Sequence, residues 1–287
     1  MKKMTTLLLA VMPFVGSAQE AASSAIYTHQ VGAYEIVVLP ENQGQGNPSI
    51  LIDATPEMLA QAIPDGTYPN AVNAFLVKTP AGNVLFDTGF GRNLTRNLAA
   101  AGVKPEDIGT LVITHAHGDH IGGMLTADGQ RAFPRARLIL SDTEKTYWVD
   151  TQKQEAATRA FNAYKENVQL VTPGKIEEPA GGDGIFYLAA PGHTPGHIVC
   201  LLRSKGEQLL IWGDLAHAMA IQMPFPQVSV RYDTDPVLAA KSRQEILKFV
   251  AEHHIPIAGM HVAFPGMGKI ENNGKGGYRF IPFSARR

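Results

Sequence analysis

The stretch Thr114-His115-Ala116-His117-Gly118-Asp119-His120 places three imidazoles and one carboxylate within six residues. These side chains are good ligands for zinc and other borderline divalent metals. The apolar run Leu111-Val112-Ile113 before it predicts a buried strand, and residues 121–125 after it can begin a helix. We therefore expect the cluster at the carboxyl end of a strand, where open α/β sheets commonly place their sites.

The spacing within this cluster predicts two neighbouring metal positions. On an extended turn His115 and His117 point to the same side and can hold one ion, while Asp119 and His120 can hold a second. Two ions about 3.5–4 Å apart can share a bridging hydroxide. A histidine-rich surface loop that binds metal by accident is the alternative, but matching residues recur later in the chain.

Four further side chains follow strand-like runs and lie at turns, as the histidine cluster does. They are Asp87 in 84–89, His193 in 190–197, Asp214 in 211–214 and His261 in 257–261. With these residues in this order, the chain resembles the metallo-β-lactamase superfamily over roughly residues 70 to 265. The resemblance implies an α/β fold, a four-layer αββα sandwich of two mixed sheets flanked by helices, with the site at one edge.

The resemblance also implies a cofactor of two divalent metal ions, with zinc expected and manganese, cobalt or iron compatible with the same donors. It divides the ligands into two sets joined by one carboxylate. The first ion takes His115, His117 and His193, the second takes Asp119, His120 and His261, and Asp214 bridges them.

The chemistry implied is hydrolysis of an ester, lactone or phosphoryl centre by the bridging hydroxide. Asp119 is expected to relay a proton to the leaving group, and Asp87 to orient a ligand without binding metal. Because Asp214 is present and the single cysteine, Cys200, is out of register with a ligand position, the sequence argues against β-lactam hydrolysis. Cys200 is expected to be a core residue. The extra basic and histidine elements of the tRNA-processing relatives are not found.

The carboxyl-terminal third looks like that of the methyl parathion hydrolase group, which is near the acyl-homoserine lactonases. The segments that carry this likeness are 191–197, 213–215, 261–268 and 276–282. Members act on phosphotriesters, lactones or aryl esters, and the ligands alone do not choose among these substrates. We expect a small-molecule substrate, with a lactone or ester leading and a phosphotriester as the alternative. A non-catalytic metal-binding protein and a single-iron oxygenase are further readings, and the complete ligand set argues against both.

His217, three residues after Asp214, is predicted to act beside Asp119 in catalysis. Some lactonases carry a tyrosine near this point that contacts the substrate oxygen, and a histidine can donate a hydrogen bond in the same way. Residues 219–230 are apolar and include Met223 and Phe225, so they form either a substrate wall or an ordinary core-capping loop. His197 is expected to support the site by packing. His29, His253 and His254 are expected at the surface.

The amino terminus has the pattern of a signal peptide over residues 1–18. Lys2-Lys3 is followed by a mostly apolar run over 5–15 and by Gly16-Ser17-Ala18, which predicts cleavage after Ala18. An uncleaved anchor is the alternative, although the run is too short to span a bilayer. We therefore expect a periplasmic or secreted protein with no stable membrane anchor. Residues 19–287 are expected to form one hydrolase domain, and a homodimer is expected from the methyl parathion hydrolase group. A net charge of −1 gives no bulk attraction to nucleic acid.

Periodicity and turn signals give an outline of the secondary structure. Residues 19–31 are predicted to be a loose leader, 40–48 a loop, and 64–70 a turn-rich segment that could cover the site. Ser141 and Glu144 have the spacing of a capping box that begins a helix. Strands are predicted at 34–39, 74–78, 84–87, 111–114, 137–140, 168–172, 185–189, 198–202, 208–212, 255–260 and 278–282. Helices are predicted at 56–63, 93–101 and 235–253, with one helix or a pair of helices over 141–164.

Overall fold

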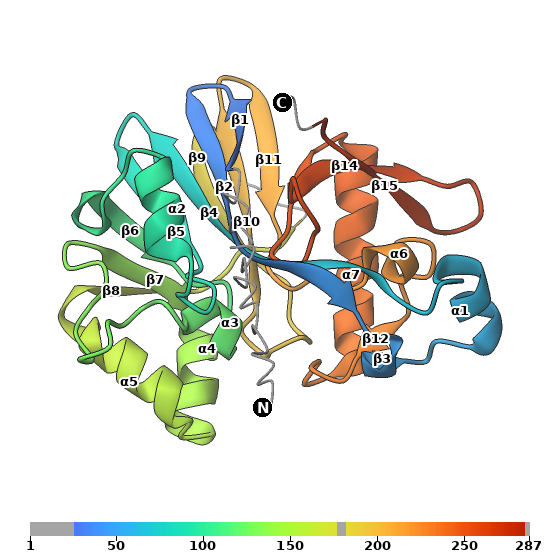
Figure 1. Cartoon of the computed structure of the whole chain (residues 1–287), viewed down its shortest axis with the longest axis horizontal. Helices are drawn as coiled ribbons and strands as arrows, with labels where there is room; N and C mark the ends of the chain where they lie inside the picture. Colours follow the sequence, from blue (N-terminus) through green and yellow to red (C-terminus); the bar gives the residue numbers. More distant parts are fainter. Residues whose placement is uncertain (1–25, 177–181, 285–287) are drawn as a thin grey trace, which may run out of the picture.

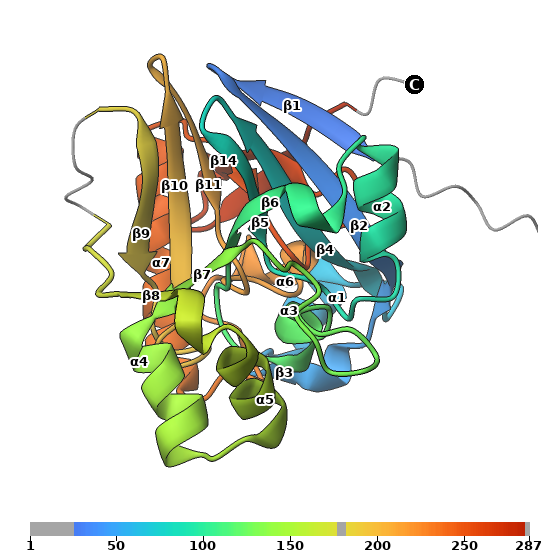
Figure 2. The same cartoon turned by 90° about the vertical axis from the view of Figure 1, so that its left-hand side faces the viewer.

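The computed structural model describes residues 26–176 and 182–284, whose strands form two large mixed sheets (Figure 1). The sheets pack face to face and helices cover their outer faces, as the two perpendicular views show (Figures 1 and 2). The layers follow the order helix, sheet, sheet, helix. The predicted four-layer αββα sandwich is therefore confirmed. The proposed signal peptide, residues 1–18, lies outside the described residues.

Within the described residues the first sheet has seven strands and the second has six. The first runs in the order β1 (Tyr27–Val31), β2 (Tyr34–Gly46), β4 (Tyr68–Thr79), β5 (Gly82–Phe86), β6 (Ile108–Val112), β7 (Arg137–Ser141) and β8 (Val168–Val171). The second runs β15 (Tyr278–Pro282), β14 (Met267–Asn272), β13 (Ile257–Ala258), β11 (Glu207–Ile211), β10 (Ile198–Ser204) and β9 (Gly184–Ala189). A short ribbon pairs β12 (Ser229–Val230) with β3 (Leu51–Ile52).

Strand direction explains why the site can form at one edge. β5, β6, β7 and β8 are parallel neighbours, and β11 is parallel to β13. The carboxyl ends of parallel strands meet at the same edge of a sheet, so the loops that follow β5, β6, β11 and β13 come together. These loops carry Asp87 and six of the seven predicted ligands, and the seventh, His193, follows β9.

The helices are short apart from one. They are α1 (Pro56–Ala62), α2 (Leu94–Ala100), α3 (Gly118–Ile121), α4 (Asp142–Lys145), α5 (Glu155–Ala163), α6 (Met219–Gln222) and α7 (Pro236–Glu252), with a π-helical segment at Thr146–Thr151. Two of them begin with a side-chain cap that is followed by proline. The side chains of Thr55 and Asp235 accept hydrogen bonds from Met58 N and Leu238 N, and proline follows each cap.

Three apolar layers hold the sandwich together, and the strand alternation assigns residues to them. Successive residues of β10 face opposite sides, so Cys200 packs between the sheets while Leu201 packs beneath α7. In β4, Leu76 faces α2 and α5, while Val77 faces the second sheet. Cys200 is fully buried, which confirms its expected place in the core.

Several element predictions were wrong: some strands are longer than expected, whereas the strand predicted at 255–260 is only Ile257–Ala258. Residues 141–164 form a pair of helical segments, α4 with its π-helical continuation and α5. Residues 40–46, predicted as a loop, continue β2 past an irregularity between Pro40 and Asn42, because the long β4 supplies a partner along this whole segment. Residues 27–31 form β1 instead of a loose leader, and β14 was not predicted. Polar, glycine-rich segments can be strands when a neighbour satisfies their backbone groups. Among the described residues no helix combines the length and apolarity that a membrane crossing requires.

Candidate metal centre

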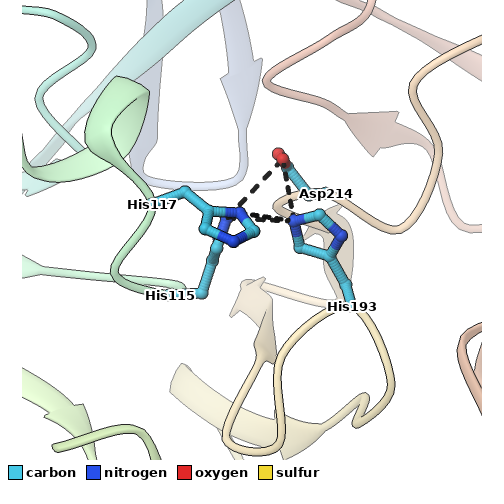
Figure 3. Close-up of side chains that lie close together, drawn as sticks. All are labelled: His115, His117, His193 and Asp214. Atoms are coloured by element: carbon cyan, nitrogen blue, oxygen red, sulfur yellow. Dashed lines mark hydrogen bonds and ion pairs between the residues drawn. The ribbon is translucent and has the colours of Figure 1, made fainter. Parts of the chain in front are cut away.

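The seven predicted ligands are brought together from both halves of the chain. His115 and His117 lie on the loop after β6, and Asp119 and His120 lie in α3 directly behind it. His193 lies between β9 and β10, Asp214 follows β11 and His261 follows β13. Figure 3 shows the loops from the two sheets converging on His115, His117, His193 and Asp214.

The three histidines of the first set point ring nitrogens at one another. His115 Nε2 lies 3.0 Å from His117 Nδ1, which lies 2.9 Å from His193 Nε2 (Figure 3). His193 Nε2 is also 3.2 Å from His115 Nε2. A tetrahedral zinc ion with Zn–N bonds of about 2.0–2.1 Å would place its ligand nitrogens roughly 3.3 Å apart. The three nitrogens therefore already have nearly the spacing that one ion requires.

The second set lies on the other side of Asp214. Asp119 approaches His120 Nε2 at 3.7 Å and His261 Nε2 at 3.4 Å. Asp214 Oδ1 lies 3.2 Å from His120 Nε2, while its Oδ2 lies 3.3 Å from His193 Nε2 and 3.0 Å from His261 Nε2. The carboxylate of Asp214 thus reaches both sets, as a bridging ligand must.

Unpaired buried atoms show that these residues fit metal ions. His120 Nε2 and Asp214 Oδ1 are buried, and neither has a hydrogen-bond partner within the described residues. Leaving such atoms unpaired is costly unless something else binds them. The donors are imidazole nitrogens and carboxylate oxygens, which suit zinc and its neighbours and leave space for water. The geometry and the donor chemistry therefore both fit a two-ion site.

Electrostatics favour the protonation state that metal binding needs at three of the ligands, whereas at His120, His193 and His261 burial is outweighed by the charge of Asp214, which raises the pKa, so that a bound ion would have to displace a proton. Burial lowers the pKa of His115 well below its usual value, and burial together with nearby His193 lowers the pKa of His117 to about 3. Burial alone would raise the pKa of Asp214, but the surrounding imidazoles, led by His120, hold it well below its usual value. His115 and His117 are therefore neutral and Asp214 is ionised at neutral pH, as metal binding requires.

Buried carboxylates fix two of the ligating rings. Asp87 Oδ2 lies 2.7 Å from His120 Nδ1, and the same side chain accepts hydrogen bonds from the backbone and hydroxyl of Thr114. Asp87 sits at φ +55°, a conformation that few residues other than glycine adopt, directly after β5. This contact with His120 is the one expected of a residue that orients a metal ligand.

Asp233 was missed by the sequence analysis and has the same function for the first set. Its Oδ1 lies 2.8 Å from His193 Nδ1, which leaves Nε2 facing the metal position. Its Oδ2 accepts a hydrogen bond from Val230 N and lies 3.8 Å from the buried guanidinium of Arg243. In the sequence Asp233 reads as an ordinary turn residue before the helix at Asp235-Pro236, so only its position in space reveals it.

His197 supports Asp214, which confirms its predicted role beside the site. Its Nδ1 faces the carbonyl of Ala190 at 3.0 Å, and its Nε2 accepts a hydrogen bond from Asp214 N at 3.0 Å. Burial lowers the pKa of His197 to about 3, so the ring stays a neutral acceptor. Gly213 takes φ +57° here, and a Cβ on it would lie 2.5 Å from His197 Nε2. Only glycine allows this close approach.

His217 lies inside the centre, beside the seven predicted ligands. Its Nε2 is 3.0 Å from Asp214 Oδ2, and its ring stacks on His261 with 4.6 Å between centroids and 21° between planes. Asp214, His217 and His261 also bring three donor atoms within the spacing that one metal ion requires, so by distance alone His217 is a further candidate ligand. In this orientation His217 is placed as a hydrogen-bond donor to Asp214, at the wall of the pocket.

A pocket of about 530 Å³ opens onto the second set of ligands. Asp119, Asp214, His217 and His261 lie at its base, together with His117. Apolar and aromatic walls come from Ile50, Tyr68, Phe90 and Tyr232, and polar groups from Asn47 and Asn70. The segment 64–70 therefore contributes to the pocket, as expected of a cover for the site.

The proposed apolar wall at residues 219–230 is not part of this pocket. Met223 is buried, and Met219 and Met223 line a separate cavity of about 550 Å³ beside Phe264 and Phe280. The core-capping alternative for this segment therefore holds. Of the outlying histidines, His253 and His254 are exposed as expected, whereas His29 is half-buried against Phe283.

Comparison with known proteins agrees with this geometry. The family model described as the metallo-beta-lactamase superfamily matches residues 67–253. The mouse metallo-beta-lactamase domain-containing protein 1 is 35% identical over 243 residues, which cover 78% of this chain and 82% of that protein. The solved structure of AidC, described as a dizinc quorum-quenching lactonase with a homoserine product, is 26% identical and superposes with a TM-score of 0.82. That match covers 91% of this chain and 98% of AidC.

A second solved structure, described as the hydrolase AbOPH of the beta lactamase superfamily, is 27% identical with a TM-score of 0.82 and the same coverage. Fold, donor set and pocket define a metal-dependent hydrolase. The chain belongs to the metallo-beta-lactamase superfamily.

Proposed function

We propose that the protein is a two-metal hydrolase that opens lactones or related neutral esters. One observation carries the proposal: Asp214 joins two complete sets of ligands at the base of a pocket that is open to small molecules. The first ion would be held by His115, His117 and His193, the second by Asp119, His120 and His261, and Asp214 would contact both. When bound, two such ions supply Lewis acidity and bring the pKa of water close to neutrality.

The remaining steps belong to side chains of the pocket. Asp119 is the exposed member of its set, with 21% of its side chain accessible, and it faces the pocket. It is therefore placed to carry a proton to the leaving alkoxide after ring opening. His217 donates to Asp214 and holds that carboxylate in place beside the substrate.

The walls of the pocket support a neutral substrate. No lysine or arginine lies among the described residues that line it, so an anionic group such as a phosphate monoester would find no cationic partner. Ile50, Tyr68, Phe90 and Tyr232 suit an acyl chain or an aromatic ring. AidC, whose fold this chain shares, is described as a lactonase, which supports lactones over other neutral esters.

The test is a comparison of kcat/KM on zinc-loaded protein lacking residues 1–18. The substrates are a long-chain acyl-homoserine lactone, an aromatic lactone and methyl parathion. We expect a lactone to be turned over orders of magnitude faster than the phosphotriester. A clear preference for methyl parathion would replace the lactonase proposal by a phosphotriesterase, and turnover of none would refute both.

The location of the protein is a separate proposal, which rests on the residue pattern of 1–18 alone. We propose export with removal of this segment. Expression of the full chain in a Gram-negative host, followed by fractionation and amino-terminal sequencing, should give a periplasmic protein that begins near Gln19. A cytoplasmic protein with an intact amino terminus would refute export.

A further inference from the structure

Glu144, in the first turn of α4, is a fully buried carboxylate with an unexpected environment. Its side chain does not complete the predicted capping box, because the structure shows no side-chain hydrogen bond at the Ser141 cap. Burial raises the pKa of Glu144, and no basic side chain in the described part of the chain offsets that effect. A buried carboxylate without a cation must be stabilised by hydrogen-bond donors.

Four donors surround this carboxylate and saturate it. Oε1 accepts hydrogen bonds from Ala116 N at 2.8 Å and Trp148 Nε1 at 2.6 Å. Oε2 accepts hydrogen bonds from Thr194 Oγ1 at 2.7 Å and Gly196 N at 3.0 Å. An ionised carboxylate has about four lone-pair sites, and all of them are used here.

These donors come from the two loops that carry the first set of ligands. Ala116 lies between His115 and His117, and Thr194 directly follows His193. The approach on the second loop is so close that a Cβ on Gly196 would lie 2.1 Å from Glu144 N. Trp148 adds a further contact, since its ring packs edge-on against His117 with 5.4 Å between centroids. One carboxylate therefore joins segments almost eighty positions apart in the chain at the point where they must share an ion.

The second set of ligands has separate supports. Asp87 holds His120, and the carbonyl of Ala71 lies 2.8 Å from His261 Nδ1. None of the four hydrogen bonds to Glu144 involves Asp119, His120 or His261. A change at Glu144 should therefore alter metal affinity at the first position and not at the second.

We propose that Glu144 is a positioning residue that aligns the loops of His115, His117 and His193 and so sets the affinity of the first metal position alone. The proposal rests on the two-metal site proposed above. Glu144→Gln is the sharpest variant, because it keeps size and shape but replaces one acceptor oxygen by an NH₂ group. In either orientation of the amide, its NH₂ group faces the backbone N–H of Ala116 or of Gly196. Both groups are donors, so that hydrogen bond is lost. Partners in this position typically change metal affinity by about 10–100-fold.

The experiment measures zinc affinity by competition with a chromophoric chelator, without any substrate. His193→Ala disables the first position and His261→Ala disables the second, so each background reports one ion. We expect Glu144→Gln to weaken the ion that remains in the His261→Ala background by about 10–100-fold. In the His193→Ala background the same change should leave the affinity of the remaining ion within about twofold, as independent sites do.

Glu41→Gln is the matched control. Glu41 is also buried and accepts two backbone hydrogen bonds, from Arg92 N and Asn93 N at 2.8 Å, but neither donor belongs to a ligand loop. The Glu41→Gln variant should lower thermal stability and leave the zinc affinity of both positions unchanged. Thr194→Val, which removes one donor and keeps the carboxylate, should give a smaller loss at the first position and serves if Glu144→Gln does not fold.

Equal weakening of both positions, or of neither, would overturn the role of Glu144 while leaving the proposed function intact. A wild-type chain that binds fewer than two zinc ions would overturn the proposed function, and the role of Glu144 with it.

Discussion

The first metal position and the second differ in how their ligands are held and in what they face. His193 is oriented by Asp233, and Glu144 accepts four hydrogen bonds, three of them from the loops of the first set. Asp119 and His261 of the second set line the pocket, as does His117 of the first. Among the described residues the buried atoms without a hydrogen-bond partner include His120 Nε2 and, in residues that line the pocket, Asp214 Oδ1, His217 Nδ1 and the hydroxyl of Tyr68. Saturated hydrogen bonding favours rigid binding, whereas unpaired groups await a ligand. On the proposed function, the first half would mainly hold an ion, and the second half would also meet the substrate.

Loss of Asp214 should affect the first and the second metal position alike and so remove the difference between them. Because its carboxylate reaches both sets, Asp214→Ala should weaken both ions and leave several buried imidazoles without a negative partner. We expect kcat/KM to fall by 10³-fold or more, because the charge of the bound metal ions lowers the activation barrier by several kcal/mol. Metal content by mass spectrometry and lactone kinetics measure the two effects. Retention of two ions per chain would show that Asp214 does not join the halves.

Asp119→Asn tests the second half alone. The amide keeps an oxygen near His261 but cannot carry a proton to the leaving group. In fully metal-loaded protein we expect kcat to fall by about 10²–10⁴-fold, the usual contribution of general acid–base catalysis. KM should change far less. The measurement is steady-state kinetics with metal content determined on the same sample, and unchanged lactone turnover would remove Asp119 from the mechanism.

Asp87→Asn and Asp233→Asn form a matched pair, one for each half. Each replaces the carboxylate that directly holds one ligand ring, His120 or His193. We expect a loss of about 10–100-fold in affinity at the corresponding ion and, for Asp87→Asn, a smaller loss at the other, because Thr114 links Asp87 to His115. Chelator competition on the two variants should give opposite patterns. Asp87→Asn should also lower Tm, because Asp87 accepts hydrogen bonds from Thr114 as well. If both variants weakened the same ion most, the division into halves would be contradicted.

The sequence predicted the ligands well because they lie in local patterns. His115, His117, Asp119 and His120 are nearly contiguous, and Asp214 and His261 each end an apolar strand, so strand position and residue type were enough. The same rule predicted Asp87 as an orienting residue. The core face of each strand was equally readable, since alternation in β10 places Cys200 between the sheets.

The residues that the sequence analysis missed or misread act over long distances. Asp233 contacts His193, 40 positions away, and Glu144 contacts Thr194, 50 positions away. Locally, both have an ordinary explanation: a turn aspartate before a helix, and a capping box. Nothing in the neighbouring residues shows which partner each carboxylate will take, because the competing partners lie far away in the sequence. The strand at 40–46 was missed for the same reason, since its partner is β4.

The smallest expected effect is that of Tyr68→Phe, a change in a residue that lines the pocket. The ring of Tyr68 packs in an apolar cluster with Ile63 and Ala218, while its hydroxyl is buried without a partner within the described residues. Burial raises the pKa of Tyr68 to about 12, so the group stays protonated. Removing an unpaired buried hydroxyl should raise the free energy of unfolding by about 1 kcal/mol.

Tyr164→Phe is the opposite control, because the hydroxyl of Tyr164 donates to Met124 O and accepts from Phe133 N. That variant should lose about 1 kcal/mol, since it breaks both hydrogen bonds and leaves a buried N–H unpaired. Urea unfolding of the two metal-loaded variants beside wild type measures both changes under the same conditions. Destabilisation of Tyr68→Phe to the same extent would mean that a water already bonds this hydroxyl. The hydroxyl of Tyr68 would then already have a hydrogen-bond partner before any substrate binds.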